Sequence, residues 1–127
     1  MKILLDTSIL IDFLRLKDKE KTLLYKISEE ELYISIITHT ELFAGKSVWE
    51  KKEARRELEE LFSGMEILPL TLEISESAGK IKSKNKNLSL LDCIIGATAI
   101  CSKMELVTLN IKDFSDISGI NFFKETN

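Results

Sequence analysis

Short, strongly apolar runs alternate with longer segments of helical periodicity along this chain. The runs cover residues 2–5, 33–37, 66–70 and 106–109, and residues 120–123 form a candidate fifth. Apolar runs of this length are typical of strands buried in a parallel sheet, with helices packed on both faces. The alternation therefore predicts an α/β fold, a three-layer α/β/α sandwich with a central, mainly parallel sheet of four to five strands.

The segments between the runs are expected to be helices. Their apolar residues recur at helical spacing, and Gly45 and Ser63-Gly64 are typical helix ends. Pro69 places the run at 66–70 at an edge or a strand end. The small residues Gly96 to Ala99 predict a close approach of the last long helix to the sheet. The expected helices are residues 8–16, 20–29, 38–44, 48–62, 72–83 and 89–103.

Length and composition fit one soluble domain over residues 1–127. A chain of 127 residues buries roughly two-thirds of its unfolded surface in a single core. No apolar stretch approaches a membrane span, and Asp6 interrupts a start that otherwise resembles a secretory signal. Cys93 and Cys101 lie too far apart along one helix for a disulfide, which fits a reducing compartment. We therefore expect a cytoplasmic protein without a membrane partner.

Four acids stand where apolar segments begin or end. Asp6 follows the first run, Glu41 comes shortly after the second, Asp92 opens an apolar helix and Asp113 lies just beyond the fourth run. Side chains at the carboxyl ends of parallel strands converge on one crevice. Converging carboxylates repel one another unless a cation neutralises them, and oxygen ligands suit Mg²⁺ or Mn²⁺. The pattern favours a metal-dependent phosphoryl-transfer site.

Each acid also has a structural interpretation. Thr38 to Glu41 and Ser89 to Asp92 both match the capping-box pattern at the start of a helix. Asp6 has the position of a helix cap, and Asp113 that of a residue in a surface turn. Independent caps would give no reason for acids after three different strands to share one edge, so their joint placement favours a site.

The same segments resemble a PIN domain, and their order and spacing are similar to those of VapC toxins from VapBC toxin–antitoxin pairs. The resemblance extends over essentially the whole chain. It implies an endoribonuclease that uses Mg²⁺ or Mn²⁺, is neutralised by a VapB-type antitoxin and forms a homodimer, with transfer RNA as the expected substrate. It is carried by residues 3–11, 36–45, 91–99 and 106–114.

Site residues follow from this resemblance. Asp6, Glu41 and Asp92 match the acids of the family, and Asn110 or Asp113, or both, complete the site. Asp6, Asp92 and Asp113 are the expected metal ligands, and Glu41 is expected to position the attacking water. Ser8 is a small polar residue beside the first acid and is an expected hydrogen-bond partner for a carboxylate.

Two further groups of residues are candidates for binding RNA or a partner protein. Lys80 and Lys84 share a helical face just before the Asp92 helix, and Arg15 ends the first helix. All three are candidates for RNA phosphate contacts or simply solvated charges. Trp49 either anchors a partner protein or completes the core together with Leu58.

Two other classes of protein share some of these features with a nuclease. A phospho-receiver domain needs paired acids after the first strand and an acceptor Asp after the third, where this chain has Thr7 and Thr71. A noncatalytic RNA-binding or scaffold protein of the same fold would be expected to lack one or more of the acids. Their presence favours an enzyme.

Overall fold

The computed structural model describes residues 1–124. Within them the strands are β1 (Lys2–Leu5), β2 (Glu31–Ser35), β3 (Glu66–Leu68) and β4 (Glu105–Val107). The helices are α1 (Thr7–Arg15), α2 (Leu23–Lys26), α3 (Ile36–Phe43), α4 (Ser47–Glu50), α5 (Lys52–Ser63), α6 (Leu72–Lys84), α7 (Leu90–Cys101) and α8 (Ile111–Phe114), with a 3₁₀ turn, η1 (Lys19–Lys21), before α2. No helix among residues 1–124 has both the length and the apolar character needed to cross a membrane.

The strands form a parallel sheet in the order β3-β2-β1-β4. In this register Leu5 pairs with Ile34 on one side and with Val107 on the other. The chain therefore leaves β1, β2 and β4 at the same edge of the sheet. The predicted parallel sheet is confirmed, whereas the candidate fifth strand amounts to one parallel bridge between Leu106 and Phe122.

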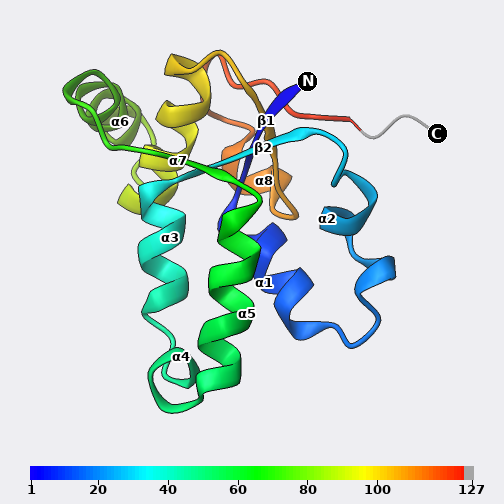
Figure 1. The fold of residues 1–127 in the computed structure, drawn as a ribbon. Coiled ribbons are helices and arrows are strands. Elements are labelled where there is room, and N and C mark those ends of the chain that lie inside the picture. The colour runs from blue at the N-terminus through cyan, green and yellow to red at the C-terminus, as the bar shows by residue number, and fades with distance from the viewer. Residues whose placement is uncertain (125–127) are drawn as a thin grey trace.

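Each face of the sheet carries its own hydrophobic core. Ile3 and Leu5 pack in a cluster with α1, α2 and α5, whereas Leu4 packs with α6 and α7. This split follows from the alternation of side chains along a strand. Each of these fully buried side chains stabilises the fold by about 1.5–3 kcal/mol. Strand β1 thus anchors both helical layers of the predicted sandwich (Figure 1).

The glycine of α7 permits a close contact different from the one predicted. A Cβ at Gly96 would lie 2.8 Å from Ile117 Cδ1 and 3.9 Å from Phe114 Cδ1. The close neighbour of Gly96 is therefore the segment that follows β4 rather than the sheet. Packing of the buried Phe114 and Ile117 offsets the weak helix propensity of glycine, about 1 kcal/mol relative to alanine.

Several element boundaries differ from the sequence prediction. Strand β2 and helix α3 both come two residues early, because Ser35 Oγ accepts the Ile37 N–H at 3.0 Å and caps a helix within the apolar run. The single helix expected over 20–29 is wrong, since η1 and the short α2 occupy that segment. The helix expected over 48–62 is interrupted at Lys51, whose backbone is extended.

Candidate active site

Asp6 is held by hydrogen bonds at the carboxyl edge of the sheet. It directly follows β1 and is 4% exposed. Its Oδ2 accepts bonds from Ser8 Oγ and from Thr108 Oγ1, both at 2.8 Å. Although Asp6 occupies the N-cap position of α1, its side chain makes no capping hydrogen bond. Its carboxylate is therefore oriented by two elements rather than used as a cap.

Glu41 lies on α3 and faces the start of α1. Thr7 Oγ1 donates to Glu41 Oε1 at 2.7 Å, and the hydroxyls of Thr7 and Thr38 are 2.9 Å apart. Because the one hydroxyl hydrogen of Thr7 goes to Glu41, Thr38 is the donor to Thr7. The capping-box interpretation of Thr38 to Glu41 is wrong, since Ser35 caps α3 and both residues lie inside the helix.

Asp92 lies in the first turn of α7, where Ser89 Oγ caps the helix by accepting the Asp92 N–H at 3.1 Å. Burial raises the pKa of the Asp92 carboxyl above its ordinary value, and the negative charge of Asp6 raises it further. A hydrogen bond with Ser89 lowers the pKa, and the charges of Glu41 and Asp113 add to the increase. The pKa of Asp92 thus depends on the charges of the other three acids, and the Asp92 N–H takes part in the cap of α7.

Two exposed residues of the β4–α8 segment, Asn110 and Asp113, are the candidates for the fourth residue of the site. Asn110 is tied in through its backbone, because its N–H donates to Thr108 Oγ1 at 2.9 Å. Asp113 is linked electrostatically through its effect on Asp92. Ser8 Oγ, besides its bond to Asp6, accepts the Leu109 N–H at 3.2 Å and so joins this segment to α1. Both Asn110 and Asp113 therefore stay candidates.

Asp6, Glu41, Asp92 and Asp113 are called the acid cluster below. Their donor chemistry fits a hydrated divalent cation. Among residues 1–124 no group of three or more Asp, Glu, His or Cys side chains is arranged to hold a metal ion. Mg²⁺, however, commonly takes one or two carboxylates and completes its shell with waters and substrate phosphates. Carboxylate, hydroxyl and amide oxygens are the hard donors it prefers. The repulsion at Asp92 is an excess of negative charge that such a cation would relieve.

The basic residues that the sequence suggested for RNA binding take no part in the hydrogen bonds around the acids. Lys80, Lys84 and Arg15 are exposed at the surface of α6 and α1. Lys82 has a structural role, since its Nζ donates to the carbonyls of Lys86 and Leu88 at 2.8 and 2.7 Å. Lys82 thereby stabilises the turn between α6 and α7. A role for the other three in binding RNA stays a prediction.

Leu58 and Trp49, the two residues expected either to complete the core or to be open to a partner, differ in burial. Leu58 is 2% exposed and belongs to the core, whereas Trp49 is 65% exposed. A separate apolar groove of about 710 Å³ lies between the α1–α2 segment and α5, and its lining includes Phe13, Leu24 and Leu61. Trp49 is therefore available to a partner, and the groove offers a second surface.

Sequence reasoning missed the threonines that orient the acids. Thr7, Thr38 and Thr108 are all buried; Thr108 links Asp6 to the end of β4, Thr7 links Glu41 to α1, and Thr38 bonds Thr7. Thr7 and Thr108 do carry a signal, because each is a polar residue within two positions of the end of a buried strand. Thr38 carries none, since threonine at that point is equally compatible with a helix cap.

Comparison with known proteins gives a consistent result over the length of the chain. The family model for the PIN domain matches residues 3–120. The sequence is also 32% identical over 117 residues to ribonuclease VapC19 of Mycobacterium tuberculosis. That alignment covers 87% of this chain and 90% of the relative.

Solved structures share the fold. A toxin–antitoxin complex from Klebsiella pneumoniae has a chain 31% identical to this one with a TM-score of 0.70, covering 93% of this chain and 94% of that one. DNA-bound VapBC from Salmonella typhimurium matches with a TM-score of 0.80 at 22% identity, covering 97% of both chains. VapBC2 from Rickettsia felis, bound to a promoter DNA fragment, matches with a TM-score of 0.79 at 20% identity, covering 99% and 100%.

Proposed function

The chain belongs to the PIN domain family, and on that basis we propose that it is an endoribonuclease of the VapC toxin type that depends on Mg²⁺ or Mn²⁺. The observation that carries the proposal is the orientation of two acids of the cluster by hydrogen bonds, Asp6 by Ser8 and Thr108 and Glu41 by Thr7. The charges of Asp6, Glu41 and Asp113 add to the burial that raises the pKa of Asp92. These acids come from four elements and share no structural role that requires their proximity. Such a cluster is costly unless it serves a cation.

In this proposal Asp6 and Asp92, with Asp113 or Asn110, hold the cation. When bound, the cation polarises the scissile phosphate and offsets the charge that develops on its oxygens. The two hydrogen bonds to Asp6 Oδ2 fix the direction of that carboxylate before substrate arrives. The chain therefore supplies an oriented ligand at little reorganisation cost.

Glu41 is assigned the role of general base. It accepts a proton from the attacking water while that oxygen bonds to phosphorus, and the bond from phosphorus to the leaving ribose oxygen breaks. The leaving oxygen then takes a proton from solvent. The bond from Thr7 to Oε1 holds the Glu41 carboxylate toward α1 and the acid cluster. Removing a general base typically costs 10²–10⁴-fold in rate, so Glu41→Gln is expected to reduce cleavage within about that range.

The direct test is cleavage of total RNA by purified protein with and without Mg²⁺. Asp6→Asn is expected to keep the fold and abolish cleavage, because it removes one charge from the cation site. Asp116→Asn is the matched control, since Asp116 is an exposed acid outside the cluster. Cleavage by Asp6→Asn at the wild-type rate with Mg²⁺ present would refute the assignment.

A VapB-type antitoxin is the proposed protein partner. Support comes from the VapBC and toxin–antitoxin complexes among the structural relatives. The apolar groove between the α1–α2 segment and α5 is suited to the apolar face of a partner helix. Coexpression with the product of a neighbouring small reading frame should yield a stable complex without RNA cleavage. A protein that stays active and uncomplexed would argue against this partner.

The finer parts of the proposal concern substrate, assembly and place of action. Transfer RNA is the proposed substrate, a homodimer the proposed assembly and the cytoplasm the proposed location, all on the strength of the family resemblance. Sequencing of the cleaved ends would identify the RNA, and sedimentation of the purified chain would give its oligomeric state.

A further inference from the structure

The surface around α4 combines an exposed tryptophan with concentrated positive charge. Trp49 is 65% exposed and is the only tryptophan of the chain. Five of the residues from 46 to 56 are Lys or Arg and two are Glu, although the whole chain carries a net charge of −3. The Trp49 patch, as we name this surface, consists of Lys46, Trp49, Lys51, Lys52, Arg55 and Arg56, all of them exposed.

The indole of Trp49 is held in place although it is exposed. Its Nε1–H donates to the Phe43 carbonyl at 2.7 Å, at the end of α3. The ring centroids of Trp49 and Phe43 are 6.0 Å apart, and the Arg55 guanidinium lies 5.1 Å from the Trp49 centroid. Since these contacts already order the ring, a ligand that stacks on it loses little affinity to ordering it.

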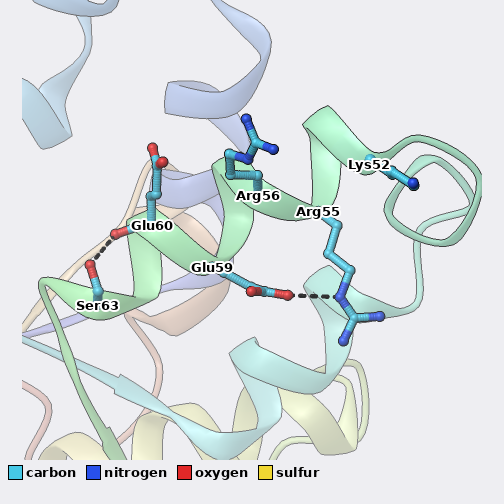
Figure 2. A pocket seen from close by; sticks show the side chains of 6 residues that line it. All are labelled: Lys52, Arg55, Arg56, Glu59, Glu60 and Ser63. Carbon is cyan, nitrogen blue, oxygen red and sulfur yellow. Dashed lines mark hydrogen bonds and ion pairs between the residues drawn. The ribbon is translucent and has the colours of Figure 1, made fainter.

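The cations of α5 extend the patch along that helix. Lys52, Arg55 and Arg56 project from α5 in different directions and line one end of a hollow of about 450 Å³, whose other end is lined by Glu59, Glu60 and Ser63 (Figure 2). Arg55 Nε donates to Glu59 Oε1 at 2.7 Å, but this pair is exposed and therefore weak. The α5 cations are thus accessible to a polyanion.

Helix α3 connects the Trp49 patch with the acid cluster. Glu41 and Phe43 are two residues apart, about 3 Å along the helix axis at 1.5 Å per residue. Phe43 in turn contacts Trp49. Helix α4 lies at the end of α3 that points away from the sheet (Figure 1). The patch therefore lies at the C-terminal end of the helix that carries Glu41, with Phe43 on a different side of that helix from the Glu41 side chain.

Single-stranded RNA has both properties that this surface matches, a negatively charged backbone and bases with free faces for stacking. An apolar protein helix would instead offer these five cations no anionic group, and the apolar groove beside α5 suits it better. We propose that the Trp49 patch binds unpaired nucleotides of the RNA substrate, with Trp49 stacking on a base and the flanking cations contacting phosphates. This inference rests on the proposed ribonuclease function and adds a substrate-binding surface outside the acid cluster.

Intrinsic fluorescence tests the proposal, because all tryptophan emission comes from the patch. Wild-type protein is titrated with a short single-stranded RNA oligonucleotide in EDTA, which prevents metal-dependent cleavage. We expect saturable quenching that weakens as salt is added. A duplex of the same sequence should quench less, since its bases are already stacked on one another.

Matched variants separate the contribution of stacking from that of charge, with affinity measured by anisotropy of a labelled oligonucleotide. Trp49→Ala should weaken binding about 5- to 150-fold, and Trp49→Phe should restore most of the loss. Lys52→Gln should reduce the slope of log affinity against log salt by about 0.7, the value for one phosphate contact on a single strand. Lys26→Gln, an exposed lysine on α2, is the control and should leave the slope unchanged.

The outcomes distinguish this inference from the proposed function. One outcome is that wild type cleaves RNA and binds the oligonucleotide without a change in its own fluorescence, while Trp49→Ala binds with wild-type affinity. In that case the patch is not the binding surface, and the ribonuclease proposal stands. If wild type neither binds nor cleaves RNA, both fail. A fluorescence change that follows protein concentration rather than RNA would make the patch an interface between copies and would overturn the inference.

Discussion

Thr108 is the residue through which the β4 end of the sheet orients Asp6. Its hydroxyl donates to Asp6 Oδ2 at 2.8 Å and accepts the Asn110 N–H at 2.9 Å. Thr108→Val keeps the shape of the side chain and removes both hydrogen bonds. We predict that this variant is less stable than wild type and cleaves RNA more slowly, because the Asp6 carboxylate loses one of its two side-chain donors.

The magnitude follows from the kinds of bond that are lost. A hydrogen bond to a charged group contributes about 1.5–3 kcal/mol. The Asn110 N–H sits on an exposed residue and can turn to water, so its loss should contribute little. We therefore expect the free energy of unfolding to fall by about 2 kcal/mol. For a chain of this size the melting temperature should fall by roughly 6–8 °C.

The assay is urea unfolding of wild type, Thr108→Val, Asp6→Asn and the double variant. A charge-assisted bond is roughly twice as strong as a neutral one, so the Thr108 substitution should cost about half as much when Asn replaces Asp6. Thr40→Val, which removes an exposed hydroxyl from α3, is the control and should change stability by less than about 0.5 kcal/mol. An equal cost of Thr108→Val in both backgrounds would refute the reasoning.

Two further substitutions test the acid cluster and the core. Asp92→Asn should raise the melting temperature of metal-free protein at neutral pH, because burial and the charge of Asp6 raise the pKa of Asp92 and give the native state more bound protons than the unfolded state. Wild type therefore loses stability as the pH rises through that raised pKa, and the higher melting temperature of the variant should disappear below the ordinary pKa of 3.8. Calorimetry of both proteins in EDTA across this pH range measures the two melting temperatures. A difference between them that does not change with pH would contradict the explanation. Leu58→Ala should cost about 2–5 kcal/mol in urea unfolding because Leu58 is fully packed between the helices, while Leu72→Ala, at an 89% exposed position, should cost almost nothing; similar losses in both would show that the Leu58 side chain is not part of the core.

Prediction of the fold from sequence succeeded where local pattern and topology agree. The apolar runs identified β1 to β4, and the parallel sheet places the ends of these strands at one edge, as predicted. Prediction failed where short-range polar contacts compete with hydrophobic pattern. Ile36 and Ile37 read as strand, but the Ser35 hydroxyl caps a helix there.

The candidate site was predictable to a similar extent. Asp6, Glu41 and Asp92 could be selected from the sequence because each stands beside an apolar segment. The hydroxyl donors could not be selected with the same ease. Thr108 and Asp6 are 102 residues apart, and nothing local distinguishes a threonine that donates to a carboxylate from one that caps a helix.

Periodicity and chain order were therefore enough to predict which layers form and which strand ends share one edge of the sheet, because both depend on backbone geometry that every parallel sheet shares. The directions of the carboxylates, the break at Lys51 and the opposite fates of Trp49 and Leu58 depend on packing between distant segments. Such packing has no signature in any single stretch of residues, and for that reason only the folded arrangement could decide them.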